Sequence, residues 1–579
     1  MKRKGLYAFL IGTAAVMLAG CQNGENEVGN ANQTKTAALS AEQCADIDGT
    51  YAEPITLKVG LDEDASLTYQ GKETRTENAW MDLYQKYGIE LDVMYTTPTD
   101  NKKDKLSQAI MAGNYPDIFW VDIDEFKDYV DQGVVADITN LYEEGYLSKD
   151  SLEYLDYDDR ASVTKATVDG KIYGIPQLAS SSDATPVLWI RKDWLDQLSL
   201  DVPETAEEFQ KVAEAFRDND PDQNGQDDTF GFGLNGKNYD DSYSGVTYFF
   251  NMFGVMPKQL TFTEQDGELI WGGAQEENMT AGLTMLRDLY QKGCIPSDFV
   301  SADRAKVEAD FTSGKTGMIF APMWGVLGTY ENLLSLDVEA EIIAVPVPGS
   351  ELNPDASVYY PSATLGFWCV SSKSEHPEVL AKIFNLSVHY MANIEDRTKE
   401  EVETYSTGRT GEYTGGALAL IPYLGSPDTN YDNWKKESKA LAENDESMLT
   451  TVEQQNQFEK IKFFVEHKNK ESYDSLNEED RMEFNSGAGL YSVFGAETSG
   501  YGALDLMIQA DKWNEEAYHS LPTDAMTQNA ANLSSLTGET LISMIMGNTP
   551  IEEYQKFIEN WKERGGQQIL DDVNEWYKN

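Results

Sequence analysis

The chain has 579 residues, of which 41% are hydrophobic, and its 99 Asp and Glu outnumber its 45 Lys and Arg. This much apolar material can fill more than one hydrophobic core, so we expect at least two domains. The formal net charge of −54 excludes nucleic acid and anionic membrane surfaces as favourable partners, because both are negatively charged.

An export leader opens the chain. Three basic residues at positions 2–4 precede an apolar run at 6–19, which is too short for a comfortable permanent membrane span. The residues LAG before Cys21 resemble the lipobox of bacterial lipoproteins, which implies that 1–20 is a signal peptide and that Cys21 is acylated. An uncleaved anchor with an incidental cysteine is the alternative. Residues 21–52 offer little to bury, and we expect them to form a flexible tether.

The remaining cysteines give no sign of a disulfide framework or a zinc site. Cys44, Cys294 and Cys369 are scattered and odd in number. The sequence has no CxxC pair, and its four histidines lack ligand spacing.

Strand and helix patterns alternate from about residue 53. Residues 55–61 alternate with period two, 80–87 carry apolar residues at helical spacing, and 89–95 return to a strand pattern. The alternation continues through a strand at 116–121, which predicts an α/β fold with mainly parallel sheets. Ligands of such sheets bind beyond the carboxyl ends of the strands, where the sequence places Asp122 and Asp124.

An acidic loop follows a helix that opens with a capping box at Thr205 and Glu208. Its oxygen ligands have the spacing of an EF-hand: Asp220, Asp222, Asn224, Gln226 through its backbone carbonyl, and Asp228. Position 12 of an EF-hand is a bidentate Glu, but here it is Gly231. The spacing alone decides neither for a Ca²⁺ loop nor for a metal-free turn. A bound Ca²⁺ would be structural, since no exiting helix follows.

Motifs of catalysis are weak in this sequence. Residues 313–316 (SGKT) resemble the end of a P-loop, but Ala309 stands where that motif needs glycine. Neither GxSxG nor HExxH occurs. Among 99 acids some pair will stand at a workable separation, so a carboxylate pair for glycoside hydrolysis stays open. The 11 Trp and 31 Tyr favour sugar binding, because flat aromatic faces suit pyranose rings.

Several segments occur in an order that resembles one family. They are PDIFWVDIDEFKDYVDQGVVADI (116–138), YGIPQ (173–177), VLWIRKDWLDQL (187–198), ADFTSGKTGMIFAPMW (309–324), LGFWCVSSKSEHPEVLAKIFN (365–385) and GGQQILDDVNEWY (565–577). In this order they resemble the extracellular solute-binding lipoproteins of carbohydrate-type bacterial ABC importers, in the branch of LipO-like and alginate-oligosaccharide-binding proteins.

The resemblance implies a two-lobed, type II periplasmic-binding-protein-like fold, with a mainly parallel sheet and flanking helices in each lobe. We expect the N-terminal lobe at 53–178 and 366–440, and the C-terminal lobe at 179–365 and 441–579. The chain should cross between the lobes near 176–186 and 361–366. The part from 392 to 440 matches nothing in the family, and its TGGALALIPYLG stretch is a candidate for the cleft wall.

The resemblance also implies roles for single residues. Trp324 falls on a sugar-stacking tryptophan, Tyr248 and Phe249 on an aromatic pair that stacks on sugar, and Asp124 on a binding aspartate. Trp120 lies one residue from the family's tryptophan. Trp189 and Arg191 match no family residue and are candidates only because of their place beside the expected hinge. The alginate-binding relatives carry a Ca²⁺ loop with an acid at position 10, where this chain has Thr229.

Together these features predict a monomeric lipoprotein on the extracytoplasmic face of the cell membrane. It would capture an oligosaccharide between two lobes and deliver it, unreacted, to the membrane subunits of an ABC importer. Two alternatives remain at this point: an exported carbohydrate-active hydrolase or lyase, and a Ca²⁺-stabilised adhesion or scaffold protein.

Overall fold

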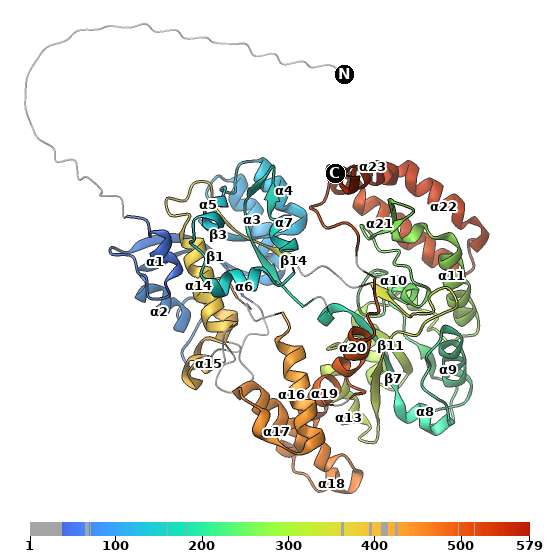
Figure 1. Ribbon diagram of the computed structural model, residues 1–579. Helices are drawn as coiled ribbons and strands as arrows, with labels where there is room; N and C mark the ends of the chain where they lie inside the picture. The colour runs from blue at the N-terminus through green and yellow to red at the C-terminus, as the bar shows by residue number, and fades with distance from the viewer. Residues whose placement is uncertain are drawn as a thin grey trace, which may run out of the picture.

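The computed structural model describes residues 37–63, 69, 71–158, 160–180, 182–359, 364–392, 397–406, 415–422, 427–495, 497–514 and 516–578. The predicted leader and Cys21 lie outside these residues. Figure 1 shows two bodies side by side. The first holds the blue and cyan segments with α14 and α15, and the second holds the green and red segments, with α16, α17 and α18 below.

The first body is built on a five-stranded sheet with the order β2-β1-β3-β14-β6. β1 runs parallel to β2 and β3, and only β14 is antiparallel to its neighbours. Every second residue of β1 is buried from Ile55 to Leu61, as its period-two pattern predicts. The strands of this sheet are β1 (Ile55–Glu63), β2 (Ile89–Pro98), β3 (Ile118–Asp122), β6 (Ile175–Leu178) and β14 (Thr364–Val370).

Helices cover this sheet and bury their apolar faces against it. In α2, for example, Trp80, Leu83 and Tyr84 are buried at helical spacing. The helices of the first body are α1 (Ala41–Ala45), α2 (Ala79–Lys86), α3 (Lys102–Met111), α4 (Ile123–Asp131), α5 (Thr139–Glu143), α6 (Lys149–Leu155), α7 (Ala161–Lys165), α14 (Val379–Met391) and α15 (Lys399–Tyr405), and a small hairpin joins β4 (Thr167–Val168) to β5 (Lys171–Ile172).

The second body has a four-stranded sheet with the order β12-β7-β11-β8. β7 is antiparallel to both neighbours, while β11 and β8 are parallel. All six residues of β7 are buried, because helices or loops cover both faces of this central strand. The strands are β7 (Pro186–Arg191), β8 (Phe230–Phe232), β11 (Thr316–Pro322) and β12 (Ile342–Val345), with smaller pairs of β9 (Phe262–Gln265) and β10 (Glu268–Trp271), and of β13 (Val358–Tyr359) and β15 (Trp513–Asn514).

The helices of the second body share one large hydrophobic core with this sheet. They are α8 (Lys192–Leu198), α9 (Ala206–Asp218), α10 (Val246–Phe249), α11 (Glu276–Gln291), α12 (Arg304–Thr312), α13 (Leu327–Leu336), α16 (Thr429–Glu443), α17 (Val452–His467), α18 (Lys470–Asp474), α19 (Glu478–Phe494), α20 (Gly500–Gln509), α21 (Asp524–Ile545), α22 (Tyr554–Trp561) and α23 (Gln567–Lys578). The capping box predicted at Thr205 and Glu208 opens α9. None of the described helices is both long and apolar enough to span a membrane.

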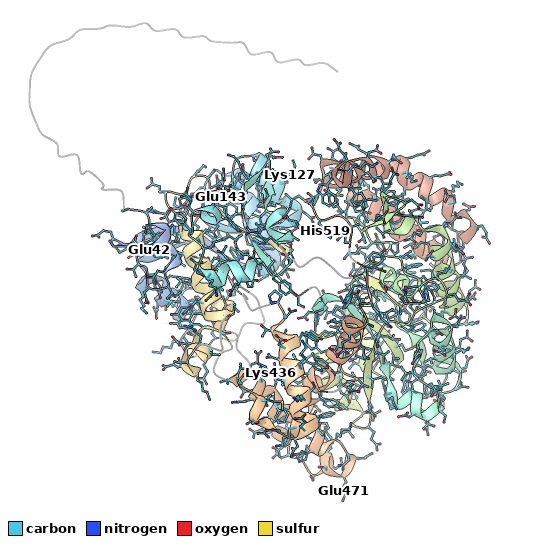
Figure 2. All side chains as sticks on the ribbon, viewed as in Figure 1. Glu42, Lys127, Glu143, Lys436, Glu471 and His519 are labelled. Carbon is cyan, nitrogen blue, oxygen red and sulfur yellow. The ribbon has the colours of Figure 1, made fainter. Side chains whose placement is uncertain are left out.

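The chain passes between the two bodies at defined ends of their sheets. β6 ends at Leu178 and β7 begins at Pro186, where it pairs with Pro322 at the end of β11. A later segment also links the bodies: Leu521 packs into the first body, and Lys127 of α4 lies 3.6 Å from Asp524 at the start of α21. Figure 2 shows Lys127 on the side of the first body that faces the second. We call these sheet ends, where β6 and β11 finish, the crossing edges.

Two predicted boundaries are wrong. The tether was expected to reach residue 52, but α1 packs on the first body, with Leu39 and Cys44 buried in its core and the Cys44 carbonyl accepting from Asn385. The first lobe was expected to reach residue 440, but Trp434 of α16 is buried in the core of the second body. Helix α16 is amphipathic, and its partners α17 and α19 lie later in the chain.

Candidate functional site: two pockets at the crossing edges

A cavity of about 190 Å³ opens at the crossing edge of the first sheet. The strands β1, β2, β3, β6 and β14 all contribute to it, and the C-terminal ends of the parallel strands meet there, as expected for an α/β sheet. We call it the first-lobe pocket. Its walls are Gly60, Leu61, Asp62, Tyr95, Thr97, Thr99, Lys102, Lys103, Leu106, Pro116, Phe119, Trp120, Asp122, Glu125, Gln177, Trp368, Ala417 and Pro422.

Glycines on neighbouring strands make room for the aromatic rings of this pocket. A Cβ atom at Gly366 would lie 2.5 Å from the Trp120 ring, and one at Gly60 would lie 2.4 Å from the Tyr95 ring. Trp120 and Trp368 are themselves paired across β3 and β14. The backbone therefore holds an aromatic wall whose rings have little freedom to rotate.

Both indoles carry a buried N–H without a partner. Trp368 is only 8% exposed, and the Nε1 atoms of Trp120 and Trp368 have no hydrogen-bond partner among the described residues. Both N–H groups have almost no exposed surface, so a ligand in the pocket contacts the indole rings and not these donors.

Charged groups complete the walls. The Lys103 ammonium lies 3.6 Å from the Glu125 carboxylate, and the Lys102 ammonium sits 3.9 Å from the centre of the Trp120 ring. Asp122 caps α4 by accepting from the Asp124 backbone N–H at 3.0 Å. Burial raises the pKa of Glu125, and the nearby Lys103 opposes that rise. The pocket thus offers carboxylate acceptors beside two ammonium groups that already have partners.

A second hollow, of about 690 Å³, lies between α12 and α13 of the second body. Trp324 stands at its edge with 40% of its surface exposed. The Arg304 guanidinium lies 5.3 Å from the Trp324 ring and 5.0 Å from the Tyr243 ring, and Arg304 Nε donates to Glu308 at 2.8 Å. These contacts hold the indole in place while it keeps a large exposed surface.

Trp324 follows Pro322, the last residue of β11, so this hollow lies at the crossing edge of the second sheet. The two predicted residues Trp120 and Asp122 line the first-lobe pocket, and the predicted Trp324 lines the second hollow. Asp124 is exposed in the first turn of α4, outside both cavities.

Four other predicted residues are buried in the second body. Trp189 and Phe249 have no exposed surface, and Arg191 is 2% exposed. Trp189 Nε1 donates to the Pro322 carbonyl, and Arg191 pairs with Asp193. Trp189, Phe249 and Arg191 are therefore core residues and not ligand contacts, which corrects the prediction. Tyr248 is 6% exposed and packs with Met256 and Tyr359.

Sequence reasoning missed several walls of the first-lobe pocket. Trp368, Gln177 and Lys102 come from segments far apart in the chain. Trp368 of β14 is paired with Trp120 of β3. The sequence alone does not show that these two strands are neighbours. The Gly-Phe-Trp run of β14 was a usable signal, because glycine in a strand marks a close approach.

The acidic loop folds around one amide. Asn224 Nδ2 donates to Asp222 at 2.8 Å and to Asp228 at 3.0 Å, and the backbone N–H of Gly225 donates to Asp220 at 3.0 Å. Burial raises the pKa of Asp222, and Asp220 and Asp228 add to the rise. No group of three or more His, Cys, Asp or Glu side chains surrounds a common metal position in the described residues. The donors nevertheless fit Ca²⁺ by type, since all are oxygens.

The structure explains why the loop lacks an EF-hand ending. Gly231 belongs to β8, and a Cβ atom there would lie 2.2 Å from the Ala213 carbonyl of α9. Thr229 is 2% exposed, and its hydroxyl donates to the Phe216 carbonyl at 2.7 Å. Strand β8 packs so closely on α9 that no acidic side chain fits at position 12.

Two lobes, each with a hollow lined by aromatic side chains at the end of its sheet, define a solute-binding protein of the two-lobed class. Residues 81–408, more than half of the chain, match the family model of the bacterial extracellular solute-binding proteins. The chain belongs to this family, whose members bind solutes outside the cytoplasm.

Known relatives agree with this assignment. The lipoprotein LipO of Bacillus subtilis is 23% identical over 98% of this chain and 97% of its own length. The polygalacturonan/rhamnogalacturonan-binding protein YtcQ of the same organism is 26% identical, over 52% of this chain and 58% of YtcQ. Among solved structures, the Streptococcus pneumoniae ABC-transporter substrate-binding protein FusA, an EF-hand mutant in complex with fructo-nystose, has a TM-score of 0.60 at 15% identity, covering 90% of this chain and 99% of FusA.

Proposed function

We propose that this protein captures an oligosaccharide between its two lobes and delivers it, chemically unchanged, to the membrane subunits of an ABC importer. The observation that carries the proposal is the pair of aromatic hollows at the crossing edges, one in each lobe. YtcQ and FusA are described as binding saccharides, which supports a carbohydrate ligand.

Each hollow has its own part in binding. In the first-lobe pocket, the indole rings of Trp120 and Trp368 form an aromatic wall for the sugar, and Asp122 accepts from sugar hydroxyls. In the second lobe, Trp324 stacks on the apolar face of a ring. Movement of the lobes about their crossing segments brings the hollows together and excludes water, and the importer recognises that closed form.

The anchor follows from the leader sequence. Acylation of Cys21 would hold the monomer at the extracytoplasmic face of the membrane, close to the importer. Two or more acyl chains hold a protein stably, while one does so only marginally.

Titration calorimetry of the mature protein against a panel of oligosaccharides tests the proposed function. We expect one ligand molecule per chain, and chromatography should recover the sugar intact. Shortened products, or no heat with any saccharide on the panel, would contradict the proposal.

We also propose that the acidic loop binds a structural Ca²⁺ through Asp220, Asp222, Asn224, Asp228 and the Gln226 carbonyl. A bound cation would neutralise the three carboxylates and fix the segment that joins α9 to β8. The solved FusA structure is described as an EF-hand mutant, which supports a loop of this kind.

Chelation tests the Ca²⁺ site. EGTA should lower the melting temperature by several degrees, because the loop then loses a ligand that binds only the folded state. Restoring Ca²⁺ should reverse the effect, and Asp222→Ala should abolish it. Asp227→Ala, a neighbouring acid outside the proposed ligand set, is the control. An unchanged melting temperature in EGTA would end this proposal.

A further inference from the structure

The first-lobe pocket has a distinctive balance of charge. Three carboxylates line it, those of Asp62, Asp122 and Glu125, and its two ammonium groups already have partners, Glu125 for Lys103 and the Trp120 ring for Lys102. Within the described residues, neither Asp62 nor Asp122 forms an ion pair within 4.0 Å. Arg75 donates from Nε to the Asp62 backbone carbonyl at 2.7 Å, and its charge attracts the Asp62 carboxylate without a hydrogen bond to it among the described residues.

The hydrogen-bonding groups of the pocket complement a polyol. Asp122 uses one oxygen to cap α4, and Asp62 accepts from the Thr99 hydroxyl at 3.3 Å, so each carboxylate keeps capacity to accept from a ligand hydroxyl. The ammonium groups of Lys102 and Lys103 line the same pocket, and each has three N–H donors, which a ligand hydroxyl or ring oxygen can accept from. A hydroxyl group is both donor and acceptor, and therefore satisfies both kinds of group at once.

The size of the pocket fits one sugar unit. A volume of about 190 Å³ accommodates about a dozen non-hydrogen atoms if each takes roughly the 15 Å³ of a water-sized site. A single hexose unit is of this size, so the pocket recognises one unit of a longer chain.

We propose that the first-lobe pocket selects an uncharged sugar unit and rejects a uronate at that position. A uronate would bring a negative charge beside Asp62 and Asp122 in a half-enclosed site, where like charges repel strongly. This inference rests on the proposed function and sharpens it. Family membership does not decide the point, because YtcQ is described as binding acidic polygalacturonan, whereas fructo-nystose in the FusA complex is neutral.

Matched pairs of ligands test the inference. Oligogalacturonates and their carboxyl-reduced forms share one stereochemistry and differ in charge, as do glucuronosyl xylo-oligosaccharides and their carboxyl-reduced forms. Calorimetry at low salt should show that the mature protein binds the neutral member of at least one pair ten-fold or more tightly. A charged member that binds equally well or better would overturn the inference while leaving the proposed function intact.

Charge-neutral variants test whether Asp62 and Asp122 cause the preference for neutral sugars. Asp122→Asn keeps an N-cap for α4, because Asn is as good a cap as Asp, and Asp62→Asn keeps an acceptor for Thr99. In the double variant the preference should shrink to about three-fold or less. Asp128→Asn, an exposed acid on the same helix, should leave it unchanged.

The variants must have the melting temperature of the wild type. If the double variant is unstable, the preference is measured in the single variant Asp122→Asn. An undiminished preference in a folded variant overturns the inference. If neutral and charged saccharides both fail to bind the wild type, the proposed function and the inference fall together.

Discussion

Two of the predicted binding tryptophans have opposite environments in this protein. Trp189 lies in β7, the strand that is buried on both faces, and has no exposed surface. Trp324 lies just beyond the end of β11 and is 40% exposed. Both follow apolar strand residues, so the difference comes from their positions relative to the sheet edge. An exposed aromatic residue at that edge is available to a ligand at little cost to the fold.

Replacing Trp324 should therefore affect binding and not stability. We expect Trp324→Ala to weaken oligosaccharide binding by about 1–3 kcal/mol, the contribution of one aromatic ring that a ligand buries. The melting temperature should stay within about a degree of wild type, since surface substitutions change stability little. Calorimetry measures the first quantity and thermal melting the second. Trp576→Ala, at a tryptophan of similar exposure (38%) on α23, is the matched control; equal losses in both variants would contradict the assignment.

Helix α16 carries an unusual buried acid. Glu437 is 1% exposed, and neither carboxyl oxygen has a hydrogen-bond partner among the described residues. Burial, together with the charge of Glu453, raises the pKa of Glu437 to about 9. The folded protein thus keeps this carboxyl protonated at neutral pH, whereas the unfolded chain ionises it near its ordinary value of 4.5.

This difference predicts how stability depends on pH. Between about pH 4.5 and 9 the folded state binds the extra proton, so this group lowers the free energy of unfolding as pH rises, by at most about 1.4 kcal/mol per unit. Glu437→Gln removes that slope and should raise the melting temperature at pH 8 more than at pH 5. Glu443→Gln, exposed on the same helix, is the control. A Glu437→Gln protein that is less stable at pH 8 would show that the carboxylate is ionised and paired.

Helix α1 is short but belongs to the folded protein. Leu39 and Cys44 are buried in the first body, and the Lys382 ammonium donates to the Asp46 carbonyl at 2.7 Å. A chain that begins at residue 53 should lose about 2–4 kcal/mol of unfolding free energy relative to one that begins at residue 37, because these side chains no longer cover the core. Urea denaturation measures the difference.

Point substitutions give an independent check on α1. Leu39→Ala should destabilise the protein, whereas Glu42→Ala, at an exposed site that Figure 2 labels, should not. Equal stability of the two truncated chains would contradict a structural role for α1.

Periodicity in the sequence predicted the helices and strands that have a repeating apolar face. It did not predict elements that only one or two buried residues hold in place. The period-two pattern of β1 and the helical spacing in α2 match the structure. Helix α1 was not predicted because Leu39 and Cys44, its two buried residues, are too few to form a periodic pattern. The residues they contact lie more than 300 positions away in the sequence. The first-lobe pocket was predicted through Trp120, Asp122 and the 414–425 stretch, whose Ala417 and Pro422 line it, whereas Trp368 and Gln177 reach it through strand pairing.

At the scale of the whole molecule, each body has its own sheet and core, and few segments connect them. One connection carries a charged cluster: burial raises the pKa of Glu516 to about 7, and Lys165 of the first body and Lys258 of the second oppose the rise. Bodies joined in this way move as units about their connections.

Capture of a ligand between the lobes therefore predicts a change in shape. An oligosaccharide that contacts both hollows binds the closed arrangement more tightly than the open one, and this difference in affinity shifts the protein toward the closed arrangement. A sugar held by one lobe alone would leave the distance between the lobes unchanged.

Small-angle X-ray scattering of the mature protein, with and without a saturating oligosaccharide identified by calorimetry, is the most direct measurement. We predict a smaller radius of gyration with ligand, by about 1 Å or more, as expected for hinge closure around a bound molecule, and a loss of this contraction in Trp324→Ala at equal ligand concentration. Tight binding with an unchanged radius of gyration would contradict capture between the lobes.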